Sequence, residues 1–370
     1  MRKNIQYKKL GDICDFISGG TPSKSKMEYW KDGKIPWIKI SDFKKKYIKI
    51  SDEKITKSGL ENSSAKILKK GTILYTIFAS VGKVAILDIE AATNQAIVGI
   101  DLKGNNLLDK DFLYYFLCSI ENNIKKQARG VAQNNINISI LKNISIPILS
   151  MSLQKSIVKT LNKLEDILEN FKQKKLLINF LNKSLFIKFN KNGVEKQLDE
   201  VADIIMGQSP LSQSYNIDKK GLPFYQGKTE FGDMYIKESN IYCNSPIKIA
   251  EKNDILMSVR APVGDVNIAI HKSCIGRGLA SIRAKKIDYL YLFYLLKEQK
   301  TRIEKMGVGS TFKAINKNNI SSLKMSIVEM NKQNKIKKYL ILTEKLSFEI
   351  EKSIKEAENL YNSLMNKYFD

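Results

Sequence analysis

The feature that most constrains this chain is an internal repeat that runs along its length. The segment KLGDICDFISGGTP (residues 9–22) is echoed by QLDEVADIIMGQSP (residues 197–210). The echo continues in order through IPWIK from Ile35 and LPFYQ from Leu222, GTILYTIFASVGKVAIL from Gly71 and NDILMSVRAPVGDVNIA from Asn253, and FLYYFL from Phe112 and YLYLFYLL from Tyr289. The second of these pairs has the pattern of a strand, a Val-Gly turn and another strand. Because ordered repeats build repeated structural units, we expect two copies of one globular fold.

Each copy ends in a long helical pattern that contains no glycine or proline. In the second copy, residues at heptad spacing run from Ile336 to Tyr368. In the first copy they run from Ile157 to Phe171, slip near Lys175, and resume at Ile178, Leu181 and Leu185. This narrow stripe is typical of a coiled-coil seam, so we expect the two helices to pair with each other. The alternative is that each helix folds back on its own domain as an ordinary amphipathic helix.

The sequence therefore predicts an α+β protein with a pseudo-two-fold internal repeat. Two similar globular domains are expected to be separated by two long antiparallel helices that form a coiled coil. The expected boundaries are 1–150 for the first domain, 151–190 for the central helix, 191–329 for the second domain and 330–370 for the C-terminal helix. A chain of 370 residues is long enough for two domains that each bury their own core.

The charge of the chain indicates a polyanionic partner. With 62 Lys and Arg against 38 Asp and Glu, the formal net charge is +24, and nucleic acid is the leading candidate partner. The alternative is that the excess of lysine reflects a bias in genomic base composition. The four cysteines show no CxxC spacing, and neither a signal peptide nor a run of about 20 apolar residues is found. We expect a soluble, cytoplasmic protein with no membrane segment.

Catalytic motifs are missing from the sequence. His271 is the single histidine, which excludes a site with several histidine ligands, and we expect no metal site. There is no GxxxxGK[ST] phosphate-binding loop, and no Asn-Pro-Pro-aromatic or Asp-Pro-Pro-aromatic loop of DNA amino-methyltransferases. We therefore expect a binding protein with no catalytic residues, not an enzyme.

The ordered motifs resemble a known family. One kind of unit is present twice. It opens with L-x-[DE]-[IV]-x-x-[IF]-x-x-G-x-[TS]-P, continues through the strand-VG-strand hairpin and a segment such as GVAQNNIN (residues 130–137), and ends in L-x-x-Q or an equivalent before a long helix. This set is similar to the specificity subunit of type I restriction-modification enzymes, the HsdS family. The resemblance implies two target recognition domains that each read half of a split double-stranded DNA sequence, with the helices as a spacer. It also implies partner subunits: a methyltransferase subunit that uses S-adenosylmethionine, and through it a restriction subunit that uses ATP and Mg²⁺. No cofactor is expected in this chain itself.

Candidate DNA-binding residues follow from the chemistry of the two kinds of contact. Phosphates are neutralised by Lys and Arg, and the adjacent Lys44, Lys45 and Lys46, near Trp30, Trp37 and Tyr47, are expected to supply such contacts; the alternative is a solvated surface run. Bases in the major groove are read by side chains that form paired hydrogen bonds. The candidates are Thr21, Lys24, Arg129, Gln133 and Asn134 in the first domain, and Gln208, Ser209, Gln226, Lys228, Arg260 and Arg277 in the second.

Two other functions remain open at the level of sequence. One is a bivalent coiled-coil adaptor, in which two protein-binding modules share a spacer and the charge is incidental. The other is a stand-alone DNA-binding regulator. Salt-dependent binding to bipartite DNA distinguishes the adaptor from the DNA readers, and dependence on a methyltransferase partner separates the regulator from a restriction-modification subunit.

Overall fold

The computed structural model describes residues 5–104, 107–121, 124, 135–307 and 314–369. The chain divides into two compact units, which are residues 1–171 with 353–370, and residues 172–352. The long helices predicted over 151–190 and 330–370 are α6 (Met151–Phe189) and α10 (Met330–Phe369). The division into units falls inside both helices, so each unit contains one globular domain and a part of each helix.

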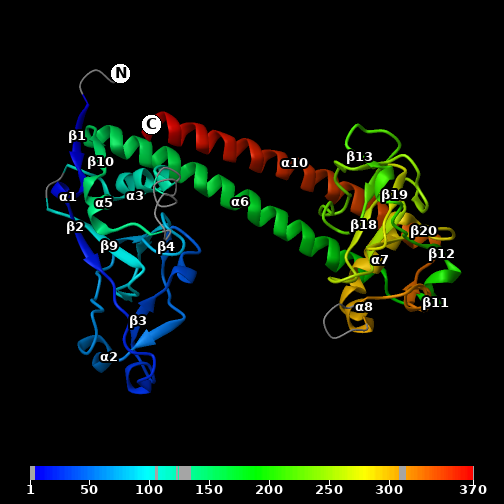
Figure 1. Ribbon diagram of the computed structural model, residues 1–370, viewed down its shortest axis with the longest axis horizontal. Coiled ribbons are helices and arrows are strands. Elements are labelled where there is room, and N and C mark those ends of the chain that lie inside the picture. Colours follow the sequence, from blue (N-terminus) through cyan, green and yellow to red (C-terminus); the bar gives the residue numbers. More distant parts are fainter. Residues whose placement is uncertain (1–4, 105–106, 122–123, 125–134, 308–313, 370) are drawn as a thin grey trace. The chain divides into compact units, whose positions relative to one another are not determined.

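The first unit combines short strands with short helices beside the start of α6 (Figure 1). Its elements are β1 (Gln6–Lys9), α1 (Leu10–Ile13), β2 (Cys14–Ser18), β3 (Ile35–Ile38), β4 (Tyr47–Ile48), β5 (Glu53–Ile55), α2 (Lys57–Glu61), β6 (Ile73–Thr76), β7 (Val84–Leu87), β8 (Ala92–Thr93), β9 (Ile97–Leu102), α3 (Lys110–Ser119), α5 (Ile138–Asn143) and β10 (Ser145–Ile148). The main sheet has the order β2-β9-β6-β7-β4, a smaller one has the order β5-β3-β8, and β1 pairs with β10.

The second unit repeats this arrangement in its main sheet and its helices but has a larger second sheet. Its elements are β11 (Val194–Gln197), β12 (Ala202–Met206), β13 (Tyr215–Asn216), β14 (Leu222–Tyr225), β15 (Tyr242–Cys243), β16 (Ile249–Ala250), β17 (Ile255–Ser258), β18 (Val266–Ile268), β19 (Ser273–Ile275), β20 (Leu279–Ala284), α7 (Tyr289–Glu298), α8 (Lys300–Met306), α9 (Lys317–Ser321) and β21 (Lys324–Ile327). The main sheet has the order β12-β20-β17-β18, the second sheet has the order β13-β15-β14-β19-β16, and β11 pairs with β21.

Strand pairing confirms the repeat that the sequence predicts. The order β2-β9-β6-β7 in the first unit is matched by β12-β20-β17-β18 in the second. The register also agrees, because Ile73 pairs with Ile100 while Ile255 pairs with Ile282, and both differences (255 − 73 and 282 − 100) are 182. The expected Val-Gly hairpins are β6–β7 and β17–β18.

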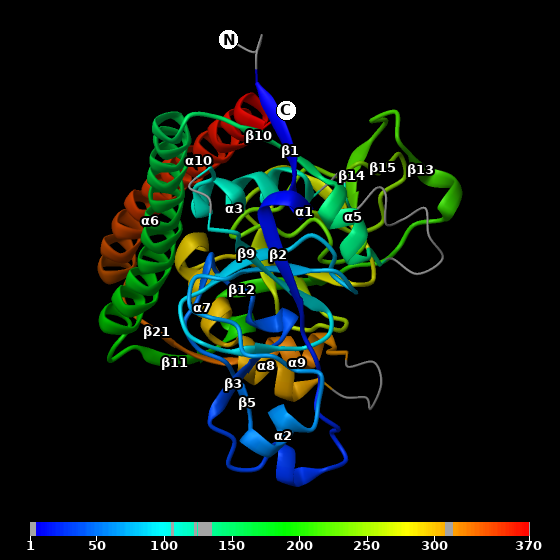
Figure 2. The same cartoon turned by 90° about the vertical axis from the view of Figure 1, so that its left-hand side faces the viewer.

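The core of each unit is closed by helices on one side of its main sheet. In the first unit α3 lies beside the start of α6 and next to β9 (Figure 2). Residues 112–117 of α3 are buried all round, because strands cover one side and the long helices cover the other. The end of α10 completes this core, since Phe369 lies 5.2 Å from Phe112 between ring centroids.

The second unit is closed in the corresponding way. Its core contains α7, the start of α10 and the end of α6. Phe186 of α6 is buried, with its ring 5.5 Å from Tyr291 and 5.9 Å from Tyr294 of α7. Phe189 stacks on Tyr339 of α10 at 5.6 Å. Each globular domain therefore uses aromatic residues that come from the long helices.

The two long helices pair antiparallel within each unit. Met365, near the end of α10, shares a core with Ile157 and Leu161 near the start of α6. Further along α6, Lys175 forms an ion pair with Glu351 at 3.0 Å. The residues of α10 predicted to form the seam are all buried or half-buried: Ile336, Leu340, Thr343, Ser347, Ile350, Ile354, Ala357, Tyr361, Leu364 and Tyr368.

The seam of α6 differs from the prediction after its slip. Ile178 is buried as expected, but Leu181 is 46% exposed and Asn182 is buried in its place. Phe186 then turns into the core of the second unit. The two long helices therefore pair with each other, as predicted. The alternative also holds in part, because the first turns of each helix pack on the domain that precedes that helix.

A buried glutamine fastens each long helix to its domain. Gln154 in α6 is fully buried, accepts a hydrogen bond from the backbone of Asp109 at 2.8 Å, and donates to the carbonyls of Leu107 and Leu149. Gln333 in α10 accepts from the backbone of Asp288 at 3.0 Å. It also donates to the carbonyl of Val328 at 2.8 Å. Both glutamines therefore join the start of a long helix to the residue that caps α3 or α7.

Replacing Gln154 by alanine should lower the stability of the chain. Gln154→Ala leaves a buried amide donor and two carbonyls without partners, so we expect the free energy of unfolding to fall by about 3 kcal/mol. Urea denaturation of the full chain measures this loss. Lys155→Ala, on the exposed neighbouring position of the same helix, is the matched control and should change stability by less than about 0.5 kcal/mol. Equal, small effects of the two substitutions would show that the buried contacts do not fasten the helix.

Candidate nucleic-acid interface

Three loops of the second unit meet at one end of its strands. They follow β12 (residues 207–210), follow β14 (residues 226–228) and connect β19 to β20 (residues 276–278). The hydroxyl of Ser209 donates to the side-chain oxygen of Gln226 at 3.1 Å and accepts the backbone N–H of Arg277 at 3.3 Å. The structure thus brings together three residues that the sequence singled out separately.

Glycines allow these loops to approach so closely. A Cβ atom at Gly207 would overlap the carbonyl of Gly276, and one at Gly278 would overlap the carbonyl of Gln226. Backbone hydrogen bonds then fix the contact, including Gly276 N–H to the Tyr225 carbonyl at 2.8 Å. The loops form a rigid platform from which the side chains of Gln208, Gln226 and Arg277 reach solvent. Amide and guanidinium groups held in this way suit the donor and acceptor pattern of a major groove.

The first unit has the same platform with different side chains. Gly20 donates its N–H to the carbonyl of Thr93 at 2.8 Å, and Asn94 donates to the carbonyl of Ile38 at 3.1 Å. The Thr21 hydroxyl, which takes the place of Ser209, donates to the side-chain oxygen of Gln95.

Two further platform residues, Gln95 and Lys39, are not among the candidates predicted from the sequence. Gln95 is exposed, and it is equivalent to Arg277 by the offset of 182 that relates the two main sheets (277 − 95). Lys39 directly follows β3 as Gln226 directly follows β14. Its ammonium lies 2.6 Å from Glu53, and this hydrogen bond raises the pKa of Lys39 above its usual value. Extending the sequence repeat through TNQAI and IGRGL would have indicated Gln95.

Two tryptophans brace the platform of the first unit. Trp37 is 2% exposed and donates its indole N–H to the carbonyl of Gly20 at 2.9 Å. Trp30 packs edge-on against it at 4.9 Å, and the exposed Lys24 lies over both rings at 5.6 and 5.9 Å. Lys24 and Trp30 line a hollow of about 400 Å³ together with Asp52, Glu53 and Lys54. Trp37 therefore supports the loop that carries Thr21 from beneath.

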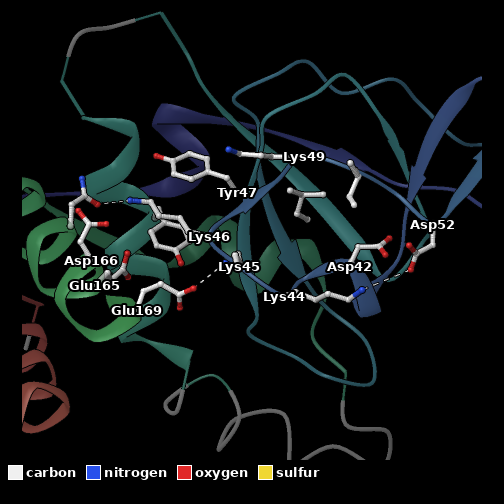
Figure 3. Close-up of a pocket in the computed structure, with 14 residues that line it drawn as sticks. Asp42, Lys44, Lys45, Lys46, Tyr47, Lys49, Asp52, Glu165, Asp166 and Glu169 are labelled. Atoms are coloured by element: carbon white, nitrogen blue, oxygen red, sulfur yellow. Dashed lines mark hydrogen bonds and ion pairs between the residues drawn. The ribbon is translucent and has the colours of Figure 1, made fainter. Parts of the chain in front are cut away.

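The lysine run of the first unit borders a cavity of about 910 Å³ (Figure 3). Glu165, Asp166 and Glu169 of α6 gather on one side of this cavity, and Lys44 lies at the opposite side beside Asp52. Lys44 and Lys45 are each 73% exposed. Their partners, Asp52 at 3.9 Å and Glu169 at 3.0 Å, are also largely exposed.

Lys46 differs from its two neighbours because its side chain is only 10% exposed. Its ammonium donates to Asn162 at 2.8 Å, pairs with Asp111 at 3.3 Å and lies 4.5 Å from the ring centre of Tyr115. These contacts hold the lysine loop against α3 and α6. Of the three lysines predicted to contact phosphates, Lys46 is therefore engaged within the protein, and the exposed Lys44 and Lys45 remain the candidate phosphate contacts.

The other candidate residues lie apart from the platforms' central hydrogen bonds. Lys228 pairs with Asp265, which also pairs with Lys300. Burial alone would raise the pKa of Asp265, but the hydrogen bonds from Lys228 and Lys300 outweigh it and hold that pKa below its usual value. Arg260 is exposed, and its backbone forms an isolated bridge with Ala314. Arg129, Gln133 and Asn134 lie outside the described residues.

Within the described part of the chain, no group of three or more His, Cys, Asp or Glu side chains could hold a metal ion. His271 instead shares a hydrogen bond with the hydroxyl of Tyr225 at 3.1 Å. None of the described helices is long and apolar enough to cross a membrane.

Comparison with known proteins identifies the family. The type I restriction modification DNA specificity domain matches residues 2–179 and again residues 190–358. The putative type I restriction enzyme MjaX specificity subunit of Methanocaldococcus jannaschii is 34% identical over 403 residues, which cover 98% of this chain and 92% of that protein.

Solved structures of type I restriction-modification proteins have a similar fold. A chain from a study of complex assembly and conformational transition of the type I R-M system superposes with a TM-score of 0.62 at 25% identity, covering 100% of this chain and 98% of that one. The S subunit of a type I restriction-modification system from M. genitalium has the same fold, with a TM-score of 0.63 at 19% identity, covering 99% and 96%. The chain therefore belongs to the family of type I restriction-modification specificity subunits, whose role is DNA recognition and not catalysis.

Proposed function

We propose that each unit of this specificity subunit reads one half of a bipartite double-stranded DNA site with its loop platform. The observation that carries this proposal is that the two platforms have one backbone design and different side chains. Thr21, Gln95 and Lys39 stand in the first unit where Ser209, Arg277 and Gln226 stand in the second. A shared scaffold with different hydrogen-bonding groups is what reading two different half-sites requires.

Affinity in this proposal comes from backbone phosphates. The net charge of +24 supplies a favourable long-range field for DNA. Exposed ion pairs such as Lys45 with Glu169 contribute little to stability, so a phosphate can replace the carboxylate at small cost. Such contacts hold the protein on DNA without distinguishing bases.

Catalysis in this proposal belongs to partner subunits. Methyltransferase subunits would supply S-adenosylmethionine chemistry, and restriction subunits bound through them would supply ATP and Mg²⁺ chemistry. Large apolar side chains that stay exposed on the long helices support a protein partner there: Leu176, Leu177 and Phe180 of α6 are 66–70% exposed, and Leu342, Leu346 and Phe348 of α10 are 52–66% exposed.

The four free cysteines fit a reducing, cytoplasmic location. We also assign the distance between the two half-sites to the paired helices.

Base reading by the platforms is tested by alanine substitution. Arg277→Ala should relax the preference at one position of one half-site by about 1–3 kcal/mol, and Gln95→Ala should do the same in the other half-site. Binding of the complete complex to a library of bipartite sites measures both. Arg302→Ala is the control, because its guanidinium is bonded to the backbone of Lys324. Changes in overall affinity without any change in sequence preference would contradict the assignment.

The three adjacent lysines should behave differently from one another. Replacing Lys44 and Lys45 together by alanine should reduce the slope of log K against log salt concentration by about 0.9 for each phosphate that is no longer neutralised. The preferred sequence should stay the same. Lys46→Ala should instead lower the stability of the first unit, because Asp111 and Asn162 would be left without their cationic partner. A changed sequence preference in the double variant would mean that these lysines read bases.

A further inference from the structure

A carboxylate joins three helices in the first unit. Glu165 of α6 accepts a hydrogen bond from the hydroxyl of Tyr115 in α3 at 2.9 Å. Its second oxygen accepts one from the hydroxyl of Tyr361 in α10 at 3.2 Å. One side chain therefore fixes the recognition domain, the helix that follows it and the partner helix to one another.

Neighbouring groups hold this contact in place. Tyr115 is fully buried, and its hydroxyl also lies 2.6 Å from Asn162 and 3.4 Å from the ammonium of Lys46. Burial first, and then the charge of Glu165, raises the pKa of Tyr115 and of Tyr361, so both hydroxyls remain protonated donors. The geometry is thus set by directional hydrogen bonds as well as by apolar packing.

The second unit has a carboxylate at the same helix position. Glu344 stands 14 residues after the first residue of α10, as Glu165 stands 14 after the first residue of α6 (344 − 330 and 165 − 151). It lies near Tyr235, which stands between β14 and β15 in the recognition domain, and burial first and then the charge of Glu344 raise the pKa of Tyr235. Burial raises the pKa of Glu344, and the nearby Tyr235 opposes that rise. Tyr294 of α7, equivalent to Tyr115, has its pKa raised to about 12 by burial and by Glu344.

A half-buried carboxylate contributes little to the free energy of folding. Taking a charge out of water is costly, and an apolar side chain of similar size at such a place is often at least as stable. Apolar contacts also tolerate sliding, whereas hydrogen bonds fix direction. Tyrosine hydroxyls hold Glu165, and tyrosines also surround Glu344 at the same position of the second repeat, which points to a requirement on orientation.

We propose that Glu165 and Glu344 are positioning residues that fix the angle of each recognition domain on its long helix, and that they thereby set the selectivity for one gap between half-sites. This inference rests on the proposed function. One extra base pair moves a half-site by about 3.4 Å and turns it by about 34°. A domain that can tilt on its helix would accept neighbouring gaps more readily than one that is fixed.

The test uses the full chain in complex with its methyltransferase subunits. Tyr115→Phe, Tyr361→Phe and Glu165→Gln are compared with the wild type on DNA that carries the natural gap, or a gap one base pair shorter or longer. We expect the preference for the natural gap to fall about five- to tenfold, while the base preference within each half-site is unchanged. Tyr235→Phe and Glu344→Gln should act in the same way from the second unit.

Tyr75→Phe is the matched control, because this buried hydroxyl has no hydrogen-bond partner among the described residues. It should leave gap preference unchanged. Tyr361→Phe keeps its ring in the helix pair, so it gives a folded variant even where Tyr115→Phe destabilises the core. If the variants fold and keep the wild-type gap preference, this inference is wrong, but the proposed function still stands. A wild-type complex without any gap preference would instead overturn the proposed function, and this inference with it.

Discussion

The structure depends on the packing of each recognition domain against both long helices. Phe186 of α6 is buried against Tyr291 and Tyr294 of the second unit, and Phe369 of α10 packs against Phe112 of the first. Burying a phenylalanine such as Phe186 contributes about 1.5–3 kcal/mol. Neither copy of the repeat supplies its whole core from its own residues. This explains in physical terms why the two copies occur together in one chain.

In each unit, a fixed backbone carries the exposed side chains that we propose to read DNA. Strand pairing and closely packed glycines fix three loops in each unit, so the exposed side chains on them are held by rigid elements. The strand order β2-β9-β6-β7 that carries these loops is matched by β12-β20-β17-β18 in the other unit, whereas the side chains at Gln95 and Arg277 differ. Binding groups placed on a rigid scaffold lose little freedom when they meet DNA. Changes of sequence preference can therefore arise by side-chain substitution without a change of fold.

Much of this architecture could be predicted from the sequence, because it depends on order and periodicity. The repeat, the Val-Gly hairpins and the seam of α10 each leave a local pattern. Lys46 could not be predicted, because its burial depends on Asn162, which lies 116 residues away in the chain. Gln95 could be found only by counting positions along the repeat, because TNQAI and IGRGL have few residues in common. Asn182 took the place of Leu181 in the seam because the last part of α6 turns toward the second core, which no local pattern records.

The DNA sequence that the complex methylates tests bipartite recognition most directly. The chain should be produced with its methyltransferase subunits, and methylated positions should be mapped across a whole genome by sequencing. We expect one bipartite motif, with two different specified half-sites separated by an unspecified gap of a single length. A continuous motif, or half-sites at variable separations, would contradict the claim that two fixed copies of one unit read the two halves of the target.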